Sequence, residues 1–288
     1  MRVRRGLIVA VLSVCTVLVS AFTASAQTEH YSRYVALGDS YTAGPLIPLQ
    51  RLDPLGCLRS TSDYPAQLAL RLLVPSFTDV SCSGADTTDM TAPQQVTLGT
   101  NPPQLDALRA DTDLVTLGIG GNDYGVFGTL VGTCPGLRAS DPTGNPCQRQ
   151  FTVDGVDTMK AKISQTQGNI TAVLTEIHRR SPQAKVLAIG YPRIAPPSGT
   201  CPNVLPFADG DYAWLNSVEE ALNQAVAKAA ADSGSSYVDT FGPSLGHDAC
   251  AGAAAWINGK DLKLTAAPYH PNFAGMTGLA AIIQAALA

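Results

Sequence analysis

The sequence has little that would suit it to nucleic acid or to a membrane interior. Lysine and arginine number 19 against 23 aspartate and glutamate residues, so the formal net charge is −4. Loss of an N-terminal leader carrying Arg2, Arg4 and Arg5 would move the charge to −7. Acidic chains are poor electrostatic partners for nucleic acid or anionic lipid, so neither is expected to bind. Beyond residue 26 no apolar run can span a bilayer, and we expect no stable membrane insertion.

Repeats, charge blocks and low-complexity linkers are also missing. Residues 27–288 are enough for one domain with a substantial core, and we predict a single domain and a monomer. The histidines and cysteines show no close metal-ligand spacing, so no metal site is expected. A dinucleotide motif Gly-x-Gly-x-x-Gly starting at Gly118 would need glycine at position 123, where Asp123 stands, so no cofactor is expected.

The N-terminal end has the pattern of a secretory signal. Residues 1–5 are positively charged, residues 6–22 are apolar, and Ala24-Ser25-Ala26 forms a small-residue cleavage site. A membrane anchor is the alternative, because the apolar run is near the minimum length for a span. The Ala-x-Ala flank favours cleavage, so we predict a signal peptide over 1–26 and a secreted protein.

Cysteine is present in a number that suggests disulfides. Seven cysteines occur, and without Cys15 in the leader six remain. An even number in an exported chain indicates three disulfides, for which fifteen pairings are possible. Pairing of neighbours is the simplest prediction: Cys57–Cys82, Cys134–Cys147 and Cys201–Cys250.

Apolar, β-rich runs alternate with helical patterns along the chain. Strands are predicted at 34–37, 77–81, 114–119, 186–189 and 237–241, and helices at 64–73, 104–109, 156–180, 213–231 and 273–287. This alternation indicates an α/β fold with a mostly parallel sheet of about five strands between helical layers, a flavodoxin-like three-layer sandwich. Segments 128–150 and 192–206 are predicted to be loops at the carboxyl edge of the sheet, where such folds bind ligands.

The first strand runs into a sharp turn at Gly38-Asp39-Ser40. Ser40 stands where a helix could begin, so its side chain could be an N-cap. It could also be a nucleophile beside the free N–H groups of the helix start. Taken alone, the turn favours the N-cap interpretation. The choice between N-cap and nucleophile depends on other segments of the chain.

Three further segments offer groups that could assist a serine nucleophile. Gly84 follows the second strand and could offer an unshielded backbone N–H, or simply form a disulfide-anchored turn. Asn122 follows the third strand, and its amide could donate to an oxyanion or lie in a plain tight turn. His270 precedes the last helix, with Pro271 as the predicted first helical residue, and could be a general base or an ordinary histidine at a helix start.

A second serine matches a known pattern. Gly242-Pro-Ser-Leu-Gly246 fits the nucleophile elbow of α/β-hydrolases. No helical pattern follows it, and too little chain remains for the later strands of that fold. We therefore interpret Ser244 as part of a turn.

Four segments, in order along the chain, resemble the four blocks of the SGNH, or GDSL-type, hydrolase family: Gly38-Asp-Ser-Tyr41, Gly84, Gly120-Gly-Asn-Asp123 and His270-Pro-Asn272. The six cysteines and Gly246-His-Asp-Ala-Cys250 resemble a secreted bacterial branch of esterases, lipases and phospholipases A with three disulfides. The resemblance implies a serine carboxylic-ester hydrolase whose substrate is a lipid or a small-molecule ester. The loops at 128–150 and 192–206 would then shape the acyl pocket.

The same resemblance implies a role for each residue. Ser40 would be the nucleophile that forms an acyl-enzyme, and His270 would accept its proton. The N–H groups of Ser40 and Gly84 and the side chain of Asn122 would form the oxyanion hole. Many members carry an aspartate three residues before the histidine, where this chain has Ala267.

Because alanine cannot accept a side-chain hydrogen bond, the resemblance implies a Ser-His dyad oriented by a main-chain carbonyl. We predict that of Ala267, with Pro268 as the neighbouring candidate and Asp248 as an alternative from elsewhere. A carbohydrate acetyl esterase is a second functional hypothesis, which the scarcity of tryptophan (Trp214 and Trp256) weakens. A catalytically inactive secreted binding protein is a third.

Overall fold

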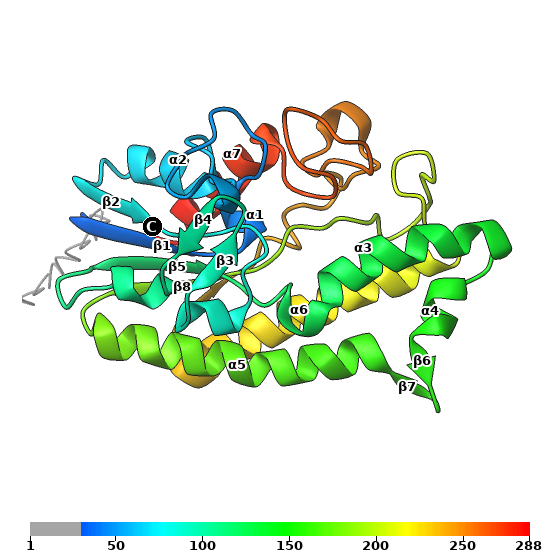
Figure 1. The fold of residues 1–288 in the computed structure, drawn as a ribbon, viewed down its shortest axis with the longest axis horizontal. Helices are drawn as coiled ribbons and strands as arrows, with labels where there is room; N and C mark the ends of the chain where they lie inside the picture. The colour runs from blue at the N-terminus through cyan, green and yellow to red at the C-terminus, as the bar shows by residue number, and fades with distance from the viewer. Residues whose placement is uncertain (1–29) are drawn as a thin grey trace, which may run out of the picture.

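One parallel sheet forms the centre of the protein, whose computed structural model describes residues 30–288 (Figure 1). The predicted signal peptide lies outside the described residues. The strand order is β2-β1-β5-β8-β9, and every neighbouring pair is parallel. Each predicted strand is present: β1 (Arg33–Gly38), β2 (Ser76–Asp79), β5 (Leu114–Gly118), β8 (Lys185–Ile189) and β9 (Ser236–Val238).

Helices cover both faces of this sheet, which confirms the predicted three-layer α/β fold (Figure 1). Side chains alternate across the sheet, so Val35 and Leu37 of β1 join the core under α5 and α6. Tyr34 and Ala36 join the opposite core, under α2 and α7. These four helices are α2 (Tyr64–Arg71), α5 (Thr158–Arg180), α6 (Asp211–Ser233) and α7 (Phe273–Ala285).

The predicted loop at 128–150 is wrong, because most of it is helical. Helix α3 (Val126–Leu137) and helix α4 (Pro146–Gln150) are joined by the 3₁₀ turn η5 (Arg138–Ser140). Glycine and proline content suggested a loop, but Val126 and Leu130 recur at helical spacing and bury an apolar face in the pocket described below. Pro135 is tolerated inside α3 near its end. The other predicted loop, at 192–206, contains no helix or strand.

Two small antiparallel pairs lie outside the main sheet: β3 (Gln94–Val96) with β4 (Gly99–Asn101), and β6 (Thr152–Val153) with β7 (Val156–Asp157). The helix predicted from 156 therefore starts two residues later, where the Asp157 side chain accepts from the N–H groups of Met159 and Lys160. Short helical turns complete the described chain: α1 (Ser40–Ala43), η1 (Leu55–Cys57), η2 (Thr87–Met90), η3 (Gln104–Ala107), η4 (Asp123–Gly125) and η6 (Gly252–Ala254).

Three disulfides join segments that are loops or short helices. They are Cys57–Cys82, Cys134–Cys147 and Cys201–Cys250, which is the pairing of neighbours. Cys57–Cys82 ties the loop after α1 to the turn after β2, and Cys134–Cys147 ties α3 to α4. Among residues 30–288, no helix is long and apolar enough to cross a bilayer.

Candidate active site

The turn after β1 presents Ser40 at the carboxyl edge of the sheet. Gly38 has φ 156°, and a Cβ there would lie 2.3 Å from Thr42 Oγ1 and 2.6 Å from the carbonyl oxygen of Gly118. Only glycine fits this close approach of backbones. The N-cap of α1 is Asp39, whose Oδ1 accepts from the Tyr41 N–H at 2.8 Å. The Ser40 hydroxyl is therefore not used as a cap.

Ser40 and His270, 230 residues apart, form a hydrogen-bonded pair. The distance from Ser40 Oγ to His270 Nε2 is 2.8 Å, and His270 Nδ1 lies 2.7 Å from the carbonyl oxygen of Pro268. Because a carbonyl oxygen can only accept, the ring carries its proton on Nδ1. Nε2 is then the acceptor that faces the serine hydroxyl, which is the tautomer a general base needs.

The orienting carbonyl belongs to Pro268, so the prediction of Ala267 is wrong. The Ala267 carbonyl is occupied by the backbone N–H of His270 at 3.3 Å, which closes a turn. Within that turn Tyr269 has φ 62°. Asp248 does not serve either, because the Nδ1–H of His270 is already paired with Pro268, and Asp248 Oδ1 accepts instead from the N–H of Cys250 at 2.9 Å.

The segment carrying His270 is held from both sides. The hydroxyl of Tyr41 donates to the Tyr269 carbonyl at 2.6 Å, and the Asn258 N–H donates to the His270 carbonyl at 2.9 Å. Pro271 is not the first residue of α7 as predicted, because it pairs with Ile257 in an isolated β-bridge. Asn272 caps the helix by accepting from the Gly275 N–H at 3.0 Å. The imidazole thus sits on a fixed turn before the helix.

Burial controls the protonation of His270. It lowers the pKa of the imidazole to about 4, and the hydrogen bond to the Pro268 carbonyl opposes this shift. The rings of Tyr41 and Phe127 lie 5.1 and 5.4 Å from the imidazole, centroid to centroid. At neutral pH the ring is therefore neutral and able to take a proton.

Hydrogen-bond donors approach Ser40 from two neighbouring strand ends. The Cys82 N–H donates to the Gly38 carbonyl at 2.9 Å, which places the turn after β2 beside the serine turn. Gly84 in that turn has φ 79° and is exposed. Among residues 30–288 the backbone N–H groups of Ser40 and Gly84 have no hydrogen-bond acceptor. Both donors are thus available to a ligand.

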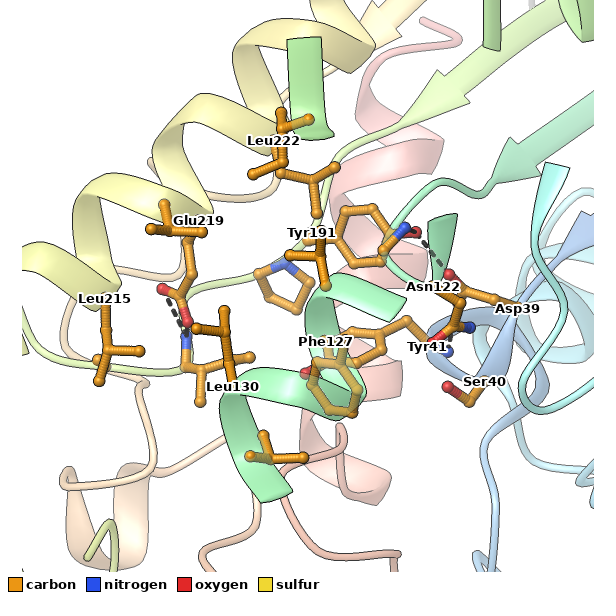
Figure 2. A pocket seen from close by; sticks show the side chains of 18 of the residues that line it. Asp39, Ser40, Tyr41, Asn122, Phe127, Leu130, Tyr191, Leu215, Glu219 and Leu222 are labelled. Atoms are coloured by element: carbon orange, nitrogen blue, oxygen red, sulfur yellow. Dashed lines mark hydrogen bonds between the residues drawn. The ribbon is translucent and has the colours of Figure 1, made fainter. Parts of the chain in front are cut away.

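Asn122 lies at the same edge, after β5. One N–H of its amide donates to the Ala85 carbonyl at 2.9 Å, next to Gly84. The side-chain amide nitrogen has two N–H groups, so the second one can donate to another acceptor. Asn122 and Ser40 line the same pocket (Figure 2). The structure therefore brings the predicted residues Ser40, Gly84, Asn122 and His270 to one sheet edge.

A buried tyrosine that the sequence analysis missed links two of these turns. The Tyr191 hydroxyl donates to Asp39 Oδ2 and accepts from the Gly121 N–H at 2.9 Å (Figure 2). Burial raises the pKa of Asp39 to about 7, and the hydrogen bond from Tyr191 opposes that rise. The position of Tyr191 two residues after β8, at the carboxyl edge of the sheet, was the sequence signal that could have identified it. Tyr191 thereby connects the turn of Ser40 to the turn of Asn122.

An apolar pocket starts at Ser40 and Asn122 (Figure 2). Apolar walls with a few polar groups at one end are typical of small-molecule sites. Helix α3, wrongly predicted as a loop, supplies one wall through Phe127 and Leu130, and the loop at 192–206 supplies Ile194 and Ala195. No group of histidine, cysteine or acidic residues within 30–288 could hold a metal ion.

The serine of the elbow-like motif is structural. Ser244 is fully buried, accepts from the Arg193 N–H at 2.8 Å and donates to the Phe241 carbonyl at 3.0 Å. It stabilises a turn, as the absence of a following helical pattern suggested.

A parallel α/β sheet with a serine and a histidine hydrogen-bonded at its carboxyl edge is the arrangement of an α/β serine hydrolase, a class that includes the SGNH type. A family model described as "GDSL-like Lipase/Acylhydrolase family" matches residues 36–277, and the chain belongs to that family. The resemblance found in the four segments is thereby confirmed, and the protein is a carboxylic ester hydrolase.

Relatives and solved structures agree with this assignment. The chain is similar to Lipase 2 of Streptomyces coelicolor, with 39% identity over 261 residues that cover 89% of this chain and 86% of that protein. It is similar to the crystal structure of phospholipase A1 from Streptomyces albidoflavus NA297, with TM-score 0.73 and 30% identity, covering 88% and 99% of the two chains. The extracellular lipase from Streptomyces rimosus gives TM-score 0.67 and 30% identity over the same shares.

Proposed function

We propose that the protein is a secreted serine esterase or lipase that acts through a Ser40–His270 dyad and an acyl-enzyme. The observation that carries the proposal is the 2.8 Å hydrogen bond between Ser40 Oγ and His270 Nε2, with Nδ1 held by the Pro268 carbonyl. The apolar pocket beside Ser40 supports an acyl group as the ligand. The leader pattern in residues 1–26 and the three disulfides support export.

In the first half of the reaction, His270 Nε2 takes the proton of Ser40 while Oγ attacks the acyl carbon of the ester. The resulting oxyanion accepts from the N–H groups of Ser40 and Gly84 and from the free amide N–H of Asn122. When the tetrahedral intermediate collapses, His270 returns the proton to the departing alcohol. Ser40 then carries the acyl group.

In the second half, His270 takes a proton from water, which attacks the acyl carbon. The same donors hold the second oxyanion. When it collapses, the bond to Ser40 Oγ breaks, His270 gives its proton to that oxygen, and the carboxylic acid is released. The Pro268 carbonyl holds the ring orientation throughout. Because it is neutral, it stabilises the imidazolium less than a carboxylate would.

An acyl substrate with a hydrocarbon chain fits the site better than an acetylated carbohydrate. The pocket is lined mainly by aliphatic and aromatic side chains and extends from Ser40 to Leu215 and Leu222 of α6, beyond the reach of an acetyl group. Neither tryptophan offers a sugar platform, because Trp214 is buried with its indole N–H on Asp157, and Trp256 stacks on His247. Proposed substrates are therefore lipid or other acyl esters.

A fluorophosphonate probe tests the proposal directly. It should add covalently to the folded protein, with the adduct on the peptide containing Ser40 by mass spectrometry. Nitrophenyl esters of increasing chain length should be hydrolysed better than acetylated xylan. A folded protein with no adduct would favour the inactive binding protein, and a preference for acetylated xylan would favour the carbohydrate esterase.

Asn122→Ala should lower kcat about 100- to 1,000-fold with little change in KM, because one oxyanion donor is lost while the acyl pocket remains. The lost hydrogen bond to Ala85 should cost about 1 kcal/mol of unfolding free energy. Asn169→Ala is the matched control, since its amide donates to Asp123 Oδ2 at 3.0 Å in the neighbouring turn. Equal losses of kcat in both variants would contradict a role for Asn122 in the oxyanion hole.

Tyr191→Phe should lower kcat about 10- to 100-fold while KM changes little, because the turns of Ser40 and Asn122 lose their shared link. Stopped-flow and steady-state kinetics on a nitrophenyl ester measure the separate changes in kcat and KM. Tyr212→Phe is the control: this tyrosine is buried and also makes two hydrogen bonds, to Cys201 N at 3.0 Å and to the Leu205 carbonyl at 2.6 Å. If Tyr212→Phe reduced kcat as much, the effect would reflect general stability, and a positioning role for Tyr191 would be wrong.

A further inference from the structure

The acyl pocket has one carboxyl group at the side opposite the nucleophile. Figure 2 shows Ser40 at one side and Leu215, Glu219 and Leu222 of α6 at the other. The spacing of these three residues, four and three positions, puts them on one face of the helix. An ester held at Ser40 therefore extends its acyl chain toward Glu219.

Glu219 has few partners for a carboxyl group in an apolar wall. Its two oxygens each lie 3.2 Å from the Ile194 N–H, which donates to them. No ion pair among residues 30–288 includes Glu219. The nearby Arg193 donates instead to Asn216, and its guanidinium lies 3.7 Å from the centroid of the Phe241 ring. Glu219 is thus a carboxyl group whose hydration depends on the pocket being open.

We propose that Glu219 is a specificity-determining residue that limits the length of the acyl chain the pocket accepts. The inference rests on the proposed esterase function, because it takes Ser40 as the point where the acyl group is held. A chain long enough to reach α6 covers the carboxyl group and removes its water. Covering a neutral carboxyl group costs much less than covering a carboxylate, so the ceiling on chain length depends on which form is present.

The surroundings of Glu219 favour the neutral form at neutral pH. Burial raises its pKa to about 8, the N–H groups of Ile194 and Ala195 and the positive charge of Arg193 oppose this shift, and the negative charge of Asp248 adds to it. Tyr41 also faces it from α1, and burial keeps the pKa of that phenol well above its usual range. Below pH 8 a long chain meets a neutral group. Above pH 8 it meets an anion that must keep its water.

The test measures kcat/KM for nitrophenyl decanoate and nitrophenyl butyrate between pH 6.5 and 9, with the background hydrolysis subtracted. The decanoate-to-butyrate ratio of the wild type should fall about tenfold across this range. Because both esters use the same dyad, titrations of His270 and Asp39 cancel in the ratio. Glu219→Gln should make the ratio independent of pH, and Glu219→Leu should make it both higher and independent of pH.

Glu220→Gln is the matched control, since Glu220 is the exposed neighbour on α6 and should leave the wild-type fall in place. A wild-type ratio that stays flat, or a Glu219→Gln ratio that still falls, would overturn the inference while butyrate hydrolysis still supports the esterase. Absence of butyrate hydrolysis in every variant and in the wild type would instead remove the proposed function. If Glu219→Leu does not fold, Glu219→Gln alone decides, because it conserves size and shape.

Discussion

Ser40→Ala should lower kcat for ester hydrolysis by about 10⁴- to 10⁶-fold, because no other group can form the acyl-enzyme at this site. The change is sterically small, and the side chain's hydrogen-bond partner is His270. The fold should therefore persist, with an unchanged circular dichroism spectrum and a closely similar Tm. The variant should also lose the fluorophosphonate adduct, which separates loss of the nucleophile from loss of substrate binding.

Ser244→Ala is the control for this result, because Ser244 lies in the sequence motif that most resembles a nucleophile elbow. Its hydroxyl holds a turn through Arg193 and Phe241, so its loss should cost about 1 kcal/mol of unfolding free energy and leave the probe adduct intact. If Ser244→Ala abolished labelling while Ser40→Ala kept it, the assignment of the nucleophile would be wrong.

His270→Gln should reduce kcat by about 10⁴-fold, since the serine hydroxyl then has no base to take its proton. Protonation of His270 at acidic pH should likewise abolish activity, because the protonated ring cannot act as a base. Burial lowers the pKa of His270 to about 4 and raises that of Asp39 to about 7. In an Asp39→Asn background, which removes the second titration, kcat/KM should therefore stay level as pH falls past 6.5 and drop only as pH falls through about 4. Stopped assays on a nitrophenyl ester at acidic pH measure this limb.

His247→Gln is the control for the second result. Its ring stacks on Trp256, and Nδ1 lies 2.7 Å from the Ala254 carbonyl, an arrangement that resembles the one at His270 but lacks a serine partner. It should retain full kcat. An acid limb near pH 6.5 in the Asp39→Asn variant would contradict the burial of the His270 imidazole, and activity retained in His270→Gln would contradict its proposed role as base.

Local pattern carried most of the fold, and the resemblance of four segments to a known family carried the site. Alternating apolar runs and helical patterns predict parallel strands, and parallel strands place all their carboxyl ends at one edge. Residues in the turns that follow a strand, such as Ser40, Gly84 and Asn122, could therefore be assigned to that edge from the sequence. Helix α3 was missed because its glycines and Pro135 carry a strong local signal for a loop, while the apolar contacts that stabilise it are tertiary.

The sequence by itself determined the α/β class, the chemical types of the site residues and the lack of an aspartate at position 267. Only the tertiary structure decided which carbonyl orients His270, because Pro268 and Ala267 differ by a single peptide plane whose direction depends on the turn at Tyr269. The links made by Tyr191 and the place of Glu219 were likewise tertiary. Both depend on side chains from the segment after β8 and from α6 meeting segments more than 20 residues distant, contacts that no local pattern encodes.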